Sequence, residues 1–254
     1  MTPNKKQRKD GENGYMRKLK KIFLLFLVIF LISTSTIATI FLFAQEQVEQ
    51  PELAEEESVQ GEEQEESVVE LTADQVNYDK ENDLMVFVGN VVIIQEKTTL
   101  TANQAFFNVD TKIGQISENV KLVQEDVTIT GEKLEAFLND KRYIFENQVE
   151  LIQEREDNQG EPDNIIWQCQ RLEIFTDTKN MTAIGEVVIT KKDYNITAQE
   201  AIYNDAEDKI SLTGKVKIEE IANNRQISGD KAVFYIGEDK LEVTGNVRSS
   251  IVLD

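Results

Sequence analysis

VFVGNVVI (residues 86–93) places alternating apolar side chains on both sides of a Gly-Asn pair, and EVTGNVRS (residues 242–249) repeats the Gly-Asn-Val triplet near the end of the chain. Period-two alternation of β-branched and aromatic residues is typical of a β-strand. Glycine inside a strand marks a bulge, a bend or a close approach of two backbones. The recurrence therefore indicates a repeat in which each unit contains one such strand.

The repeat occurs six times between residues 71 and 254. LTADQVNYDK (71–80), LTANQAFFNV (100–109) and ITAQEAIYND (196–205) align with one another, and a valine stands nineteen residues after the second residue of every unit. Successive units start 29, 29, 38, 29 and 31 residues apart, so the extra residues fall between units, in a polar surface loop around residues 154–164. The starting residues are Thr72, Thr101, Thr130, Gln168, Thr197 and Ser228, and the valines are Val91, Val120, Val149, Val187, Val216 and Val247.

Each unit predicts two strands. Positions four and six after the start are mostly apolar, and positions 13, 15, 19 and 21 alternate along one face, as in Met85, Phe87, Val91 and Ile93. Short polar segments such as 79–83 separate the two strands and suit hairpin turns. Units of this length cannot bury an apolar face alone, so they must stack on one another. We expect an all-β antiparallel body of about twelve strands with very little helix.

The composition excludes several classes of function. The chain has no histidine, and so lacks the usual general base and zinc ligand; no carboxylate pair stands out as catalytic. We therefore expect no enzyme activity, no metal and no cofactor. The formal net charge of −20 disfavours binding to nucleic-acid phosphates. The single cysteine, Cys169, is expected to be a small buried apolar residue rather than a reactive thiol.

The N-terminal region predicts a membrane anchor and a tether. Residues 22–44 contain no charge, and a helix of that length reaches about 34 Å, enough to span a bilayer. A cleaved signal peptide is the alternative, but its apolar core is only ~7–15 residues long and residues 42–44 match a cleavage site poorly. Eight basic residues within 1–21 place the N-terminus in the cytoplasm and the rest on the far side. Residues 45–70 carry eleven glutamates and predict a disordered linker.

An uncharged membrane segment followed by repeated "TAxxAxY…GxV" hairpins resembles the OstA-like (LptA–LptC) family, the periplasmic bridge proteins of lipopolysaccharide transport. The resemblance covers residues 71–254. It implies a β-jellyroll folded like a taco shell, in which two antiparallel sheets enclose an apolar groove. It also implies an inner-membrane protein with its C-terminal domain in the periplasm, in the slot of the anchored, LptC-like member. The long acidic linker departs from that slot, and the repeats are more similar to those of the soluble member.

The resemblance further implies cargo and partners. Acyl chains of lipopolysaccharide or a related glycolipid would lie in the groove, delivered by an inner-membrane ABC transporter; this chain has no phosphate-binding Gly-x-x-x-x-Gly-Lys motif of its own. Open edge strands would pair with neighbouring proteins, the first unit with the transporter and the last with a soluble OstA-like bridge protein. The groove candidates are Met85, Phe87, Val91, Phe107, Phe145, Leu212, Val216 and Phe234, and the edge candidates are Leu71, Val76, Leu241, Val243 and Val247.

Two questions stay open at this level. The inward aromatic residues suit either lipid contact or ordinary core packing, and a membrane-anchored structural or adhesive repeat protein without cargo would have a fully filled interior. The geometry at the repeated glycine is also open. Glu118 occupies this position in the second unit and is costly in a dry interior, so the position is expected at a bend or sheet margin. Yet the alternation continues in phase across it, which a simple one-residue bulge would break.

Overall fold

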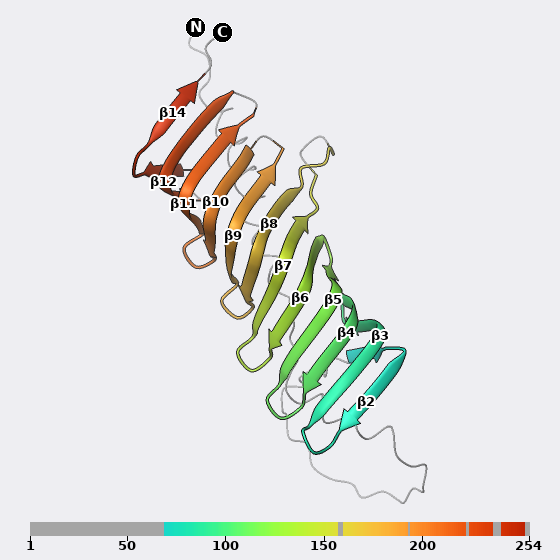
Figure 1. Cartoon of the computed structure of the whole chain (residues 1–254). Helices are drawn as coiled ribbons and strands as arrows, with labels where there is room; N and C mark the ends of the chain where they lie inside the picture. Colours follow the sequence, from blue (N-terminus) through green and yellow to red (C-terminus); the bar gives the residue numbers. More distant parts are fainter. Residues whose placement is uncertain (1–68, 157–159, 193, 222–223, 236–239, 252–254) are drawn as a thin grey trace, which may run out of the picture.

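The computed structural model of the chain describes residues 69–156, 160–192, 194–221, 224–235 and 240–251. These residues form one fourteen-stranded antiparallel sheet and no helix, which confirms the all-β prediction. Strands β3 to β12 lie side by side in chain order, and β1 and β2 flank β3 while β13 and β14 flank β12 at the two ends (Figure 1). They are β1 (Val69–Thr72), β2 (Gln75–Asp79), β3 (Leu84–Gln95), β4 (Thr98–Asn108), β5 (Ile113–Gln124), β6 (Val127–Phe137), β7 (Arg142–Gln153), β8 (Ile165–Phe175), β9 (Asn180–Lys191), β10 (Tyr194–Asn204), β11 (Lys209–Glu220), β12 (Arg225–Tyr235), β13 (Lys240–Thr244) and β14 (Arg248–Ile251).

The fourteen strands make up the six two-strand units that the repeat predicts. Strands β1 and β2 both pair with β3, and β13 and β14 both pair with β12, so each of these two pairs acts as one interrupted edge strand. Counting each pair as one strand leaves the twelve expected strands. The extra residues between the third and fourth units form the predicted loop between β7 and β8, where the Asp163 amide donates to the Arg155 carbonyl at 2.8 Å.

Each unit bends at the repeated glycine position, where two consecutive residues adopt left-handed backbone conformations. Their φ angles lie between 46° and 82°, a region that glycine and asparagine tolerate best. The two residues oppose a single residue of the neighbouring strand, which is the count of a β-bulge. Glu118 is exposed there, so the predicted bend position is confirmed. The six pairs are Gly89–Asn90, Glu118–Asn119, Asn147–Gln148, Gly185–Glu186, Gly214–Lys215 and Gly245–Asn246.

The bulge also explains why the alternation stayed in phase. The bulged strand β3 keeps its phase, because Phe87 and Val91 both point inward on either side of the pair. The phase changes instead on the first strand of each unit. In β4, Ala102 and Ala105 are both buried although they are three residues apart. Period-two alternation therefore continues along β3 but breaks along β4, so the bulge cannot be recognised from the sequence of β3 alone.

A row of polar side chains covers these bends. The middle residue of every first strand is an acid or an amide: Asp74, Asn103, Glu132, Gln170, Gln199 and Asp230. Four of them share a side-chain hydrogen bond with the residue after the glycine position: Asn90 to Asp74 (2.9 Å), Gln148 to Glu132 (3.3 Å), Gln170 to Glu186 (3.2 Å) and Asn246 to Asp230 (2.9 Å).

The bends align across the sheet and form a crease that divides it into two walls. Wall A contains β1 and β14, the N-terminal halves of the first strand of each unit (β4, β6, β8, β10 and β12), and the C-terminal halves of the second strands (β3, β5, β7, β9 and β11). Wall B contains β2, β13 and the remaining halves. Apart from neighbours in the sheet, no two described strands bring their Cα atoms within 8 Å, so the walls meet through side chains alone. The predicted jellyroll is thus one meander folded along its crease.

The outer face of wall B is held by a lattice of ion pairs around Ile144. This side chain points away from the interior, yet it is only 3% exposed, since its neighbours cover it. Arg142 also lies over the ring of Phe137, 4.1 Å from the centroid. Individually such partly exposed pairs contribute little, typically below about 1 kcal/mol. The pairs are Lys133–Glu135 (2.6 Å), Lys133–Glu146 (3.8 Å), Arg142–Glu173 (3.2 Å), Arg171–Glu146 (2.7 Å) and Arg171–Glu173 (3.7 Å).

Candidate functional site

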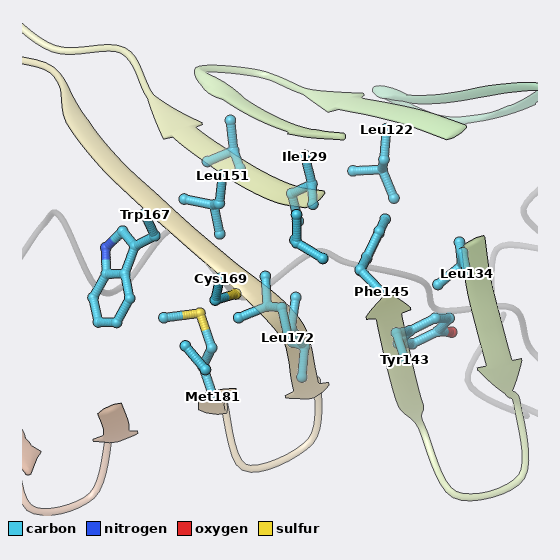
Figure 2. Close-up of a cluster of buried hydrophobic side chains, with 14 of the residues drawn as sticks. Leu122, Ile129, Leu134, Tyr143, Phe145, Leu151, Trp167, Cys169, Leu172 and Met181 are labelled. Atoms are coloured by element: carbon cyan, nitrogen blue, oxygen red, sulfur yellow. The ribbon is translucent and has the colours of Figure 1, made fainter. Parts of the chain in front are cut away.

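The inner faces of the two walls enclose a continuous apolar interior. Figure 2 shows Leu122, Ile129 and Leu151 of wall A pointing toward side chains of wall B. Those opposite residues include Tyr143 and Phe145. Among the described residues, the buried polar or charged side chains are Gln95, Thr98, Gln124 and Gln153. The rest of the buried face is apolar, which is the property that the resemblance requires of a lipid track.

Burial varies along this interior. In the centre the walls are in contact, and Phe145 is 0% exposed. On the strands near the two ends of the sheet, the inner residues farthest from the crease are only partly buried, as at Met85, Phe107 and Phe234. Of the eight groove candidates, these three are partly buried, and the other five are buried, although two of them share β3 with Met85: Phe87, Val91, Phe145, Leu212 and Val216. All eight belong to one face of the sheet. The resemblance implies an open groove along the whole sheet, but in the centre the two walls are closed against each other.

The layer next to the crease consists of valines paired with small residues. Each of the first five repeat valines lies opposite an alanine, glycine or cysteine of the following unit. At Gly131 an added Cβ would already lie 3.4 Å from the Glu146 carbonyl oxygen, so there is little room for larger side chains. The pairs are Val91–Ala102, Val120–Gly131, Val149–Cys169, Val187–Ala198 and Val216–Gly229. The repeat valine therefore marks the narrow apex between the walls.

Cys169 belongs to this apex layer, as the prediction of a small buried residue requires. It is 5% exposed, and burial raises the pKa of its thiol to about 11. An exposed thiol has a pKa of about 8.5, and the thiolate is the nucleophile. The neutral, shielded form therefore dominates in the folded protein.

We expect Cys169 to resist thiol reagents while the protein is folded. With 5,5′-dithiobis(2-nitrobenzoate) at pH 8, modification in urea should be complete within the usual reaction time, and in native buffer slower by about a hundredfold or more. Absorbance of the released thionitrobenzoate follows the reaction. Equal rates in the two buffers would contradict the burial of this residue.

A polar row borders the interior at the rim of wall A that lies away from the crease. Gln95, Gln124 and Gln153 are the last inward residues of β3, β5 and β7, and they are only 4–6% exposed. Sequence reasoning missed them, although they recur 29 residues apart, because the search followed apolar positions only. The same position holds Lys191 in the fourth unit, within 3.5 Å of Asp163, and Glu220 in the fifth, paired with Arg225.

The two ends of the sheet are the edges that were predicted. Strands β1 and β2 form the first edge and β13 and β14 the last, and each pairs on one side only among the described strands. Of the five edge candidates, Leu71 and Val243 pack partly against the core, whereas Val76, Leu241 and Val247 are exposed. Unpaired edges present backbone donors and acceptors that another strand can use.

No cluster of side chains suited to a metal ion occurs in the described part of the chain. Within the same residues, no helix has the length and hydropathy needed to cross a membrane. The segments 1–21 and 22–44 and almost all of the linker 45–70 lie outside the described residues.

Fold and interior define a class: a folded β-meander built from in-phase hairpin repeats, with an apolar interior and open edges. The family model described as "LptA/(LptD N-terminal domain) LPS transport protein" matches residues 107–240, and the model described as "OstA-like protein" matches residues 54–157. The chain therefore belongs to the OstA-like family of lipopolysaccharide transport proteins, and the family assignment made from the repeat is confirmed.

Comparison with individual proteins adds one solved structure. The chain is similar to that of "LptH, the LptA homologous periplasmic component of the conserved lipopolysaccharide transport device from Pseudomonas aeruginosa", with 13% sequence identity and a TM-score of 0.21. The similarity covers 74% of this chain and 96% of that chain. No curated protein matches the chain.

Proposed function

We propose that this protein is a membrane-anchored component of lipopolysaccharide export that holds the acyl chains of the glycolipid between its two walls. The observation that carries the proposal is the inner face itself, which is apolar from the first unit to the last except for the polar row at the rim of wall A. Each methylene transferred from water to such a surface contributes about 0.8 kcal/mol. Many weak contacts spread along a track allow a chain to slide, whereas one deep specific pocket would retain it.

Entry of cargo requires the walls to separate, at least in the centre. The walls meet through side chains and are joined by backbone only at the crease, so a change of angle there leaves every strand pair intact. The partly buried residues at the two ends, such as Met85 and Phe234, need the smallest opening. We therefore infer that acyl chains enter and leave at the ends of the sheet and open the centre as they pass.

The N-terminal region supports a place for the protein at the inner membrane. Residues 22–44 would anchor it in the inner membrane, with residues 1–21 in the cytoplasm and residues 45–70 as a periplasmic tether to the folded domain, residues 71–254. This is the LptC-like slot, beside an inner-membrane ABC transporter. The edge formed by β1 and β2 would pair with the transporter, and the edge formed by β13 and β14 with a soluble OstA-like protein.

One observation favours a second function. The complete burial of Phe145 and its neighbours is what a structural or adhesive repeat protein without cargo would have. Such a protein keeps its walls closed permanently, so the two proposals differ in whether lipid ever reaches the central side chains.

Photo-crosslinking in living cells separates the two. With a photoreactive amino acid at Phe87, Phe107 or Phe145, we expect adducts with an acylated glycolipid that disappear when the transporter's ATPase is inactive. Gln168 is the control, because it is exposed on the outer face of wall A. Detection uses antibodies against the glycolipid after electrophoresis. If inward and outward positions give the same labelling, the protein is not a lipid track.

A further inference from the structure

The buried glutamines at the rim of wall A form a regular row. In register, Gln95 lies opposite Thr98, Thr98 opposite Gln124, Gln124 opposite Val127, and Val127 opposite Gln153. Glutamines thus occupy every second strand across the first three units. Strands lie about 4.8 Å apart, so successive glutamines are roughly 10 Å apart. This spacing places one amide group per unit along the same side of the interior.

The row coincides with a change in the polarity of the inner face. Two residues closer to the crease on the same strands stand Leu122 and Leu151, which are fully buried among apolar neighbours. The glutamines follow as the last inward side chains before the chain leaves wall A, through a hairpin turn after Gln95 and Gln124 and through the long loop after Gln153. A molecule lying between the walls would therefore meet apolar surface at depth and neutral amides at the rim.

Close packing at the rim of wall A does not require glutamine. A buried amide loses its hydration and must find hydrogen-bond partners inside the protein, whereas a leucine would close the rim without that requirement. Val127 and Ile165 occupy in-register positions in the same row, so the backbone accepts apolar residues there. When the walls separate, however, an amide can exchange its partners for new ones, and an apolar side chain cannot.

We propose that Gln95, Gln124 and Gln153 recognise the amide and ester groups through which acyl chains are joined to the sugar of the cargo. Each glutamine side chain offers two N–H donors and a carbonyl acceptor: the donors suit the carbonyl of an amide or an ester, and the acceptor suits the N–H of an amide. The row fixes how deep the chains insert, because the linkage groups stay at the rim while the methylenes lie below. Lys191 and Glu220 interrupt the neutral row in the fourth and fifth units, so this recognition belongs to the first three.

The proposal rests on the proposed function and is tested with a matched pair of probes. One is a photoreactive N-hexadecanoyl-glucosamine, and the other is the matching photoreactive 2-O-hexadecyl-glucose, whose ether linkage has no N–H donor and no carbonyl. Full-length protein in lipid nanodiscs is labelled with each probe. The variants are Gln124→Leu, Gln124→Asn, which keeps the amide, and the double variant Gln124→Leu with Gln153→Leu. Gln115→Leu is the control, because Gln115 lies on the same strand and is exposed on the outer face.

We expect the unaltered protein and the Gln115→Leu control to label with the amide-linked probe about tenfold more strongly than with the ether-linked one. The preference should fall most in the double variant, in which only Gln95 of the row remains, shrink less in Gln124→Leu and persist in part in Gln124→Asn. Gln124→Asn separates loss of recognition from partial unfolding, because it disturbs the packing of the rim but keeps the amide group. Labelling of the unaltered protein by both probes without preference, or a preference that is undiminished in the double variant, overturns the role of the glutamines alone. Absence of labelling by either probe overturns the proposed function as well.

Discussion

Replacement of Phe145 by alanine is expected to lower the free energy of unfolding by about 3–5 kcal/mol, the range found when a fully buried phenylalanine is truncated. Phe145 is 0% exposed on β7, with Leu134 and Leu172 opposite it on the two neighbouring strands. Those strands are hydrogen-bonded to β7, so the surroundings cannot collapse into the space left by the ring. Equilibrium unfolding in urea, followed by the tryptophan fluorescence of Trp167, gives the change in free energy.

Phe137→Ala is the matched control for this variant. Phe137 is also a phenylalanine in the centre of the sheet, but it lies on the outer face of wall B beneath Arg142. Its truncation removes a cation–π contact and a partly buried ring, so we expect a loss of about 1 kcal/mol. If the two variants lose equal stability, the walls are apart in solution and the closed centre is wrong. The difference in the free energy of unfolding between the two variants therefore also indicates how strongly the closed interior resists opening by cargo.

The repeat was predictable because its signal is spread over six copies. A valine nineteen residues from each start identified the units, and the polar segments between them identified the turns, the long loop and the two edges. Individual strands would have been less informative. β4 changes the phase of its inward side chains at Asn103, so simple alternation fails along its length. The in-phase copies compensated for this irregularity.

The state of the interior was not predictable in the same way. Alternation identifies which side chains point inward, as for Phe145, but it carries no measure of the distance between two walls that approach across the crease. The apex layer decides that distance, through small residues such as Gly131 and Cys169 that look unremarkable in a strand. The rim glutamines could not be predicted for a related reason. From sequence alone, a polar residue in a strand is expected to face solvent, and only the strand register shows that these three face inward.

The crease geometry supplies the second large expected effect. Replacement of Gly185 by valine should destabilise the protein by about 2–4 kcal/mol, because a left-handed backbone costs an L-residue about 1–2 kcal/mol and a β-branched one more. Gly185 has a φ of +80°, and a Cβ added there would lie 3.0 Å from the Cβ and Cγ of Gln170, which must shift. The crease holds both walls in register, so the loss should appear as cooperative unfolding at lower urea concentration.

Gly185→Asn is the control for this variant. It also adds a side chain at this position, but asparagine tolerates the left-handed backbone that valine does not. Asn147 occupies the equivalent position in the third unit with a φ of 63°, and Glu118 does so in the second with a φ of 66°, so the bend accepts residues other than glycine. Asparagine adopts this conformation more readily than other L-residues, and we expect a loss of about 1 kcal/mol or less. Valine and asparagine variants of equal stability would mean that the crease at Gly185 relaxes to an ordinary extended strand. In that case the left-handed residue pairs would not fix the backbone at the crease, and the crease could not set the angle between the two walls.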